Sequence, residues 1–204
     1  MDVQAVSRIP GVMMEVCKIA LLFSAVLFAD FANAACPSIV SRSDWGARAP
    51  TETTAMRTPV DYVIIHHTTT GSCSSRDSCS RILRNVQNDH MNNRKPKFSD
   101  IGYTYLIGGD GKVYEGRGWD TQGAHAPNYN HRSIGISFIG NFQRSRPPSS
   151  QLRAAQDLIE CAVEKGKLKR DYKLLGHRQT KATDCPGQAL YDIIKTWPKW
   201  TSNP

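Results

Sequence analysis

The stretch Val60-Asp61-Tyr62-Val63-Ile64-Ile65-His66-His67-Thr68 decides the fold class. Its β-branched and aromatic side chains over 62–66 predict a buried strand, because such side chains pack well on a pleated sheet. The apolar run ends on His66, whose imidazole can bind Zn²⁺ through a ring nitrogen. We therefore expect a buried strand that carries a candidate metal ligand at its end.

A second stretch, Gly176-His177-Arg178-Gln179-Thr180-Lys181-Ala182-Thr183-Asp184-Cys185-Pro186-Gly187, carries two further candidate ligands. His177 and Cys185 stand eight residues apart, and Pro186 disfavours the helical conformation for the residue before it. We expect a loop that folds back so that the imidazole and the thiol face one point. Two histidines and one cysteine with an open fourth position are typical of a catalytic zinc site, which we expect in a surface groove.

Residues 1–34 have the pattern of a secretory signal peptide. Two basic residues precede the apolar run 19–28, and the small residues Ala32-Asn33-Ala34 follow at the cleavage positions. The alternative is a buried N-terminal helix. We expect a secreted, extracellular protein whose mature part, residues 35–204, is one domain without a segment apolar enough to span a membrane.

The cysteines agree with secretion. Of the six, one lies in the predicted signal, and the remaining odd number leaves one thiol to explain. Cys73 and Cys79 are close enough to close a small loop, and Cys36 and Cys161 can tie the mature N-terminus to a helix. Cys185 then remains for a metal ion. The alternative is that Cys185 forms a disulfide and another cysteine is free.

The formal net charge of +8 indicates either acidic partners or a solvated basic surface. Lys and Arg are spread along the chain, and no recognisable nucleic-acid-binding module accompanies them, so we expect no nucleic-acid partner. Acidic polymers of bacterial surfaces are the more natural partner of a basic secreted protein.

The rest of the mature chain alternates strands with helices. A helix is predicted from Ser74 or Ser75, with His90 on its inward stripe, where it either reaches a cleft or is a satisfied core histidine. We expect strands at 103–107 and 112–115 joined by a Gly-rich turn, a functional loop at 116–130, a strand at 133–139, a helix at 151–164 capped by Ser149 or Ser150, a strand at 172–175 and a last helix from Pro186 to Trp197. This order predicts an α/β domain with a central mixed β-sheet flanked by helices.

Several stretches resemble the peptidoglycan recognition protein family, which is related to the phage lysozyme-type zinc amidases. They are Val63-Ile64-Ile65-His66-His67-Thr68, Asp100-Ile101-Gly102-Tyr103, Val113-Tyr114-Glu115-Gly116-Arg117-Gly118-Trp119, Ser133-Ile134-Gly135-Ile136-Ser137-Phe138-Ile139-Gly140-Asn141-Phe142 and Cys185-Pro186-Gly187. Together they span nearly all of the mature chain in the family's order. The overall build resembles the short secreted insect members.

The resemblance implies a role for each matching residue. Zinc is expected on His66, His177 and Cys185, with Tyr103 and Thr183 assisting catalysis. His67 follows His66 on a strand and so points to the opposite side unless the strand has ended; the resemblance nevertheless implies that it contacts the stem peptide. The full set that we assign to substrate binding is His67, His90, Arg117, Trp119, His125 and Asn130. Arg117 matches a position where Arg accompanies a preference for meso-diaminopimelate, whose extra carboxylate a guanidinium can bind. Lys97-Phe98 stands where members with this preference often carry Gly-Trp, and a Phe is closer to the lysine-type pattern. On balance we expect a modest preference for the diaminopimelate type.

Two functions compete on this basis. The first is a zinc-dependent N-acetylmuramoyl-L-alanine amidase that cleaves bacterial peptidoglycan. The second is a receptor that binds peptidoglycan without cutting it and triggers an immune protease cascade of the Toll or prophenoloxidase type, with cascade proteins as partners. The complete ligand set favours the amidase, because binding alone does not need a thiol beside two imidazoles. The likeness to short insect receptors favours the second.

Overall fold

The computed structural model of the chain describes residue 1 and residues 36–204, so the predicted signal peptide lies, apart from Met1, outside the described residues. The described part contains a six-stranded sheet of order β1-β4-β3-β5-β2-β6. Its strands are β1 (Ile39–Val40), β2 (Val60–His67), β3 (Tyr105–Ile107), β4 (Val113–Glu115), β5 (Ser133–Phe138) and β6 (Leu168–Gly176). All neighbours are parallel except the antiparallel β3–β4 hairpin, so the sheet is mixed, as predicted.

Strand β2 is the apolar stretch from which the site is built. It lies between β5 and β6 and is parallel to both. A strand that is covered on both faces reads as a nearly continuous apolar run, and Val63, Ile64 and Ile65 are all fully buried. The alternation of side chains places Val63 and Ile65 in the main core and Tyr62 and Ile64 in a smaller cluster on the other face.

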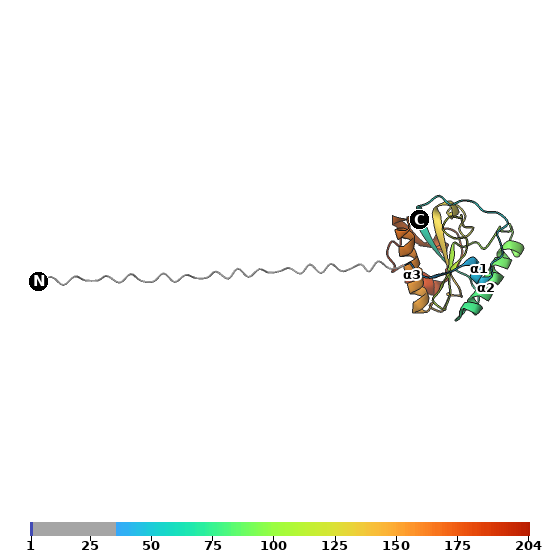
Figure 1. Cartoon of the computed structure of the whole chain (residues 1–204), viewed down its shortest axis with the longest axis horizontal. Coiled ribbons are helices and arrows are strands. Elements are labelled where there is room, and N and C mark those ends of the chain that lie inside the picture. Colours follow the sequence, from blue (N-terminus) through green and yellow to red (C-terminus); the bar gives the residue numbers. More distant parts are fainter. Residues whose placement is uncertain (2–35) are drawn as a thin grey trace. The chain divides into compact units, whose positions relative to one another are not determined.

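Helices cover both faces of the sheet (Figure 1). α3 (Ser149–Glu164) and α4 (Gln188–Ile194) supply Leu158 and Ile194 to the main core. α1 (Arg42–Trp45) and α2 (Arg76–Asn88) supply Trp45 and Leu83 to a second core, shared with Leu106 of β3. The fold is therefore the predicted α/β arrangement, with a sheet between two layers of helices.

Helix α2 begins as predicted and continues into the site. Ser75 is its N-cap, and the Ser75 hydroxyl accepts a hydrogen bond from Ser78 N–H. The chain continues after α2 as a π-helical turn, Asp89–Asn93, which contains His90. π-Helical turns frequently occur at functional sites.

The predicted start of α3 and both ends of α4 are wrong. α3 begins at Ser149 because Pro148, whose φ of −56° suits a helix start, takes the cap position and its carbonyl accepts from Leu152 N–H. α4 begins at Gln188 rather than Pro186 because Gly187 has a φ of +89°, a conformation that a right-handed helix cannot contain. It ends at Ile194, before Trp197.

Two predicted strands also have other bounds. β6 runs over nine residues, Leu168–Gly176, instead of 172–175, because exposed polar residues over 169–171 interrupt the apolar pattern of this edge strand. β3 is shorter than the predicted 103–107 and begins at Tyr105. Tyr103 thus lies just before the strand.

Disulfides join Cys36 to Cys161 and Cys73 to Cys79, the two pairs suggested by the sequence. Cys185 is the free cysteine of the described residues. Among the described helices, none combines the length and apolar character that crossing a membrane requires.

Candidate metal centre

Two parallel strands bring two histidines to the same edge of the sheet. Ile65 of β2 pairs with Gly176 of β6, and His66 and His177 are the next residues along each chain segment. His177 begins a short 3₁₀ helix, His177–Gln179. Because the carboxyl ends of parallel strands lie at one edge, the two imidazoles meet with ring centroids 4.3 Å apart.

The loop after this 3₁₀ helix returns the thiol of Cys185 to the same edge. Arg178 N–H donates to Cys185 O at 2.8 Å, which closes the loop on itself. Thr183 Oγ1 accepts from Cys185 N–H at 3.3 Å, and Cys185 Sγ accepts from His67 N–H at 3.4 Å. The thiol is thus positioned by its own loop and by the end of β2.

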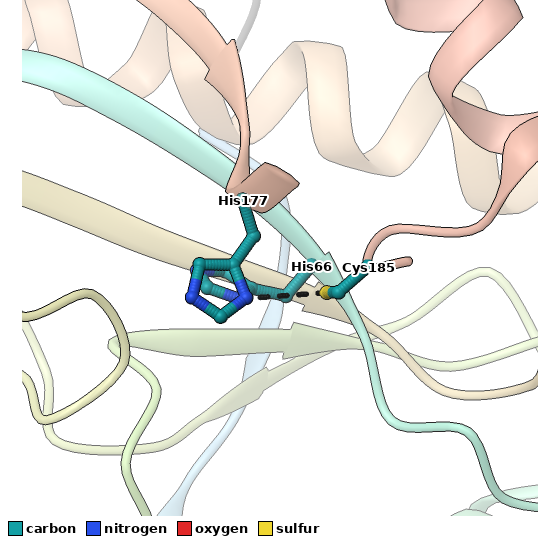
Figure 2. A group of neighbouring side chains, drawn as sticks. All are labelled: His66, His177 and Cys185. Atoms are coloured by element: carbon teal, nitrogen blue, oxygen red, sulfur yellow. Dashed lines mark hydrogen bonds between the residues drawn. The ribbon is translucent and has the colours of Figure 1, made fainter. Parts of the chain in front are cut away.

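The three candidate ligands converge. The ligand atoms of His66, His177 and Cys185 lie within 4.8 Å of one another, and Figure 2 shows the two rings and the sulfur gathered at one point. His66 Nδ1 lies 3.7 Å from Cys185 Sγ, while His177 Nε2 is buried with no hydrogen-bond partner among the described residues. Imidazole nitrogen and sulfur are donors that Zn²⁺ prefers, so the residues fit a zinc ion with one coordination position left open.

Burial sets the protonation of these ligands. It lowers the pKa of His66 well below 6.5 and the pKa of His177 to about 4, so both imidazoles are neutral at physiological pH, the form that binds metals. Burial raises the pKa of the Cys185 thiol to about 12. A bound cation deprotonates a coordinating thiol, so the thiolate forms only together with the metal at neutral pH.

A pocket of about 230 Å³ opens over the two histidines. Tyr103 forms part of its wall, with its ring centroid 5.3 Å from that of His66. Burial, with Cys185 nearby, raises the pKa of Tyr103 to about 12, so its hydroxyl remains a hydrogen-bond donor at neutral pH. The lining residues are His66, His90, Arg94, Phe98, Tyr103, Ala124, His125, Pro127, Asn130, His177 and Lys181.

The pocket continues into a longer groove. A second hollow of about 240 Å³ shares His90, Arg94 and Tyr103 with the first and extends to the three threonines after β2, Thr68–Thr70. The two candidate histidine ligands therefore line one part of a longer groove.

A protein-family model described as N-acetylmuramoyl-L-alanine amidase matches residues 56–188. Peptidoglycan-recognition protein 2 of Holotrichia diomphalia is 47% identical over 191 residues, which cover 94% of this chain and 100% of the relative. The chain belongs to the peptidoglycan recognition protein family. Among solved structures, Drosophila peptidoglycan recognition protein SA matches with a TM-score of 0.80 at 45% identity, over 83% of this chain and 96% of that chain. Peptidoglycan recognition protein LE, solved in complex with tracheal cytotoxin, a monomeric diaminopimelic acid-type peptidoglycan, matches with a TM-score of 0.78 at 42% identity, over 80% of this chain and 96% of that chain.

The six residues assigned to substrate binding fall into two groups: three line the pocket and three lie outside its lining. His90, His125 and Asn130 line the pocket with Tyr103. Asn130 also holds the loop in place, because its Oδ1 accepts from His125 N–H and Ala126 N–H at 2.9 and 2.8 Å. His90 is satisfied as well, since its Nδ1 accepts from Gly102 N–H at 2.9 Å.

His67 lies on the other side of β2. The strand continues through His67, so its side chain points away from His66 toward the main core, where His67 Nδ1 accepts from Phe142 N–H at 3.2 Å. His67 therefore lies on the far side of the strand from His66 and is not among the residues that line the pocket.

Arg117 and Trp119 are also placed outside the pocket lining. Arg117 donates from Nε to Ile101 O at 2.7 Å and from Nη1 to Gln122 O at 2.9 Å, so it braces two loops. Trp119 packs on Tyr105, with ring centroids 4.4 Å apart.

Five lining residues were not among the residues predicted for the site; besides Ala124 and Pro127 they are Arg94, Phe98 and Lys181. Arg94 and Phe98 belong to the polar loop that follows His90, which carries the basic stretch Arg94-Lys95-Pro96-Lys97. Lys181 lies in the loop between the second and third candidate ligands. A cluster of exposed cations next to a candidate site is the signal that indicates such residues.

Proposed function

We propose that this protein is secreted, binds bacterial peptidoglycan and hydrolyses the amide between N-acetylmuramic acid and L-alanine, with zinc held by His66, His177 and Cys185. The observation that carries the proposal is the convergence of two imidazoles and one thiol, with both imidazoles lining an open groove. Membership of the peptidoglycan recognition protein family and the match to an amidase model support the same conclusion.

The residues around the ligands have separate tasks in this reaction. Zinc, when bound, supplies Lewis-acid chemistry that activates water and polarises a carbonyl. Tyr103 donates a hydrogen bond from its hydroxyl to the oxyanion that develops as the amide carbonyl is attacked, and its raised pKa keeps the proton on the phenol. The hydroxyl oxygen of Thr183 accepts a hydrogen bond from the backbone N–H of Cys185 and so holds Cys185 in position.

The groove suits a carboxylate-bearing peptide attached to a sugar. Phe98 and Tyr103 offer aromatic faces, and Arg94 and Lys181 are cations that can pair with stem-peptide carboxylates. The solved complex of the relative LE contains a peptidoglycan fragment of this chemical class.

The second candidate is recognition without cleavage, in which binding activates an immune protease cascade. It is favoured by the fact that the relatives are called recognition proteins. The two candidates share a ligand and differ only in whether the amide is broken.

Digestion of purified peptidoglycan tests the choice between them. We expect zinc-loaded wild type to release free stem peptides, detected by mass spectrometry, and to hold one zinc per chain by elemental analysis. Cys185→Ser should lose the activity and most of the zinc while still binding peptidoglycan. His131→Ala, at an exposed histidine outside the pocket lining, is the matched control and should behave as wild type. No release by the zinc-loaded wild type, with binding intact, would leave recognition alone as the function.

A further inference from the structure

The imidazole of His66 is held at both of its ring nitrogens. Nδ1 lies 3.7 Å from Cys185 Sγ, and Nε2 lies 3.0 Å from Nδ1 of His125. The His66 side chain is only 1% exposed, so these two neighbours and not solvent determine its orientation. A neutral imidazole has one donor nitrogen and one acceptor nitrogen. If Nδ1 faces the other ligands with a free lone pair, Nε2 must carry the proton and donate it to His125.

His125 is itself fixed in place. Its backbone N–H donates to Asn130 Oδ1 at 2.9 Å, and its ring meets the ring of His66 edge-on, with an interplanar angle of 84°. The ring is buried, with an exposed fraction of 6%. If Nδ1 of His125 is the acceptor in this contact, the proton of the neutral His125 ring is on Nε2, which is buried with no hydrogen-bond partner among the described residues.

Two glycines make room for the His125 ring. A Cβ atom on Gly135 would lie 2.4 Å from His125 Cδ2, and a Cβ atom on Gly123 would also lie 2.4 Å from it. Neither glycine has a φ in the left-handed region, so the backbone conformation does not require glycine at either position. Gly135 lies on β5 directly beside Ile64 of β2, so the sheet itself provides the space next to His66.

We infer that His125 is a positioning residue for the metal centre: it holds His66 in the tautomer with its proton on Nε2 and thereby presents Nδ1 to the metal. The inference rests on the proposed zinc site and extends it beyond the three ligands. Partners of this kind, which receive the second ring N–H of a ligating histidine, fix the orientation of the ring and increase metal affinity. On this view, His125 lines the pocket because it lies beside His66.

A matched pair of variants tests the inference. In His125→Asn the side-chain oxygen can take the place of Nδ1 and accept from His66, whereas His125→Leu has nearly the same shape and no acceptor. We expect zinc affinity, measured by competition with a chromogenic chelator, to fall about 10–100-fold in His125→Leu and to be largely restored in His125→Asn. Equal zinc affinities of wild type, His125→Leu and His125→Asn would overturn the inference.

A second measurement does not depend on zinc. Long-range ¹H–¹⁵N spectra of the metal-free full chain report which ring nitrogen of each histidine is protonated. We expect His66 protonated on Nε2 in the wild type and in His125→Asn, and a mixture of tautomers in His125→Leu. Finding His66 protonated on Nδ1 in the wild type would overturn the positioning role. A wild type with the expected tautomer but without zinc binding would instead contradict the proposed function and leave the hydrogen bond in place.

Gly135→Ala provides an independent approach to the same contact. The three atoms nearest to its Cβ all belong to the His125 ring, which it displaces, so we expect reduced zinc affinity with the Nε2–H signal of His66 shifted or broadened. Circular dichroism identifies any loss of folding. A folded Gly135→Ala protein with the zinc affinity and the His66 spectrum of the wild type would contradict the inference.

Discussion

His66 and His177 lie with their ring centroids 4.3 Å apart because the strands that deliver them, β2 and β6, are parallel neighbours. The register of this pair is decisive. A shift by one residue would turn one imidazole to the opposite face of the sheet, since side chains alternate along a strand. The buried residues Val63, Ile64 and Ile65 of β2 prevent such a shift, because each side chain would move to the opposite face of the sheet and lose its packing partners. The core therefore maintains the metal centre.

Tyr103→Phe is expected to reduce amidase turnover by about 10²–10³-fold, because loss of one well-placed oxyanion donor has an effect of this size. Zinc content should not change, since the phenol is not among the convergent ligands. Turnover is measured as release of stem peptide. Tyr172→Phe, far from the pocket lining, is the control. Wild-type turnover in Tyr103→Phe would exclude the donor role.

Arg117→Thr is expected to lower the free energy of unfolding by about 3 kcal/mol, because two charge-assisted hydrogen bonds to Ile101 O and Gln122 O are lost. Denaturant unfolding of the metal-free protein measures the change. The same substitution at Arg144, an exposed arginine, should change stability very little. If both variants unfold like the wild type, the bracing role of Arg117 is wrong.

Arg94 and Lys181 are expected to bind the extra carboxylate of diaminopimelate, because both line the pocket. The Arg117 guanidinium already donates hydrogen bonds to two backbone carbonyls. We predict a modest preference for diaminopimelate-type over lysine-type muropeptides. Arg94→Gln or Lys181→Gln should reduce it up to about tenfold. Calorimetric titration of matched muropeptides tests this. A preference that survives both substitutions and disappears in Arg117→Thr would return the role to Arg117.

His90 should make the stability of the metal-free protein depend on pH. Burial, followed by the charge of Arg94, lowers the pKa of His90 to about 4, against 6.5 for an ordinary histidine. The unfolded state therefore binds more protons between pH 4 and 6.5, and the free energy of unfolding falls as the pH drops through this window, by up to about 3 kcal/mol. His90→Gln should make the dependence measured by denaturant unfolding shallower, while the other buried histidines, such as His66 and His177, keep their share of it. A slope equal to that of the wild type, or of the exposed-site control His131→Gln, would refute this.

Strong local patterns in the sequence were enough to predict several elements correctly. The apolar run before His66 predicted β2, the Gly-rich turn predicted the β3–β4 hairpin, and Ser75 predicted the start of α2. It also grouped His66, His177 and Cys185, whose ligand atoms the structure places within 4.8 Å of one another. These features can be predicted from the sequence because residue type, hydrophobic period and capping chemistry act over a few neighbouring positions.

The contacts of each side chain in the site became known from the folded structure and not from local patterns. The partnership of His66 with His125, the burial of His67 beneath the site and the engagement of Arg117 by Ile101 and Gln122 join residues from different elements. No local pattern encodes such contacts, because they depend on which strands become neighbours and in which register. The physical reason is that packing and burial, which set orientation and protonation here, are properties of the assembled sheet and not of any single segment.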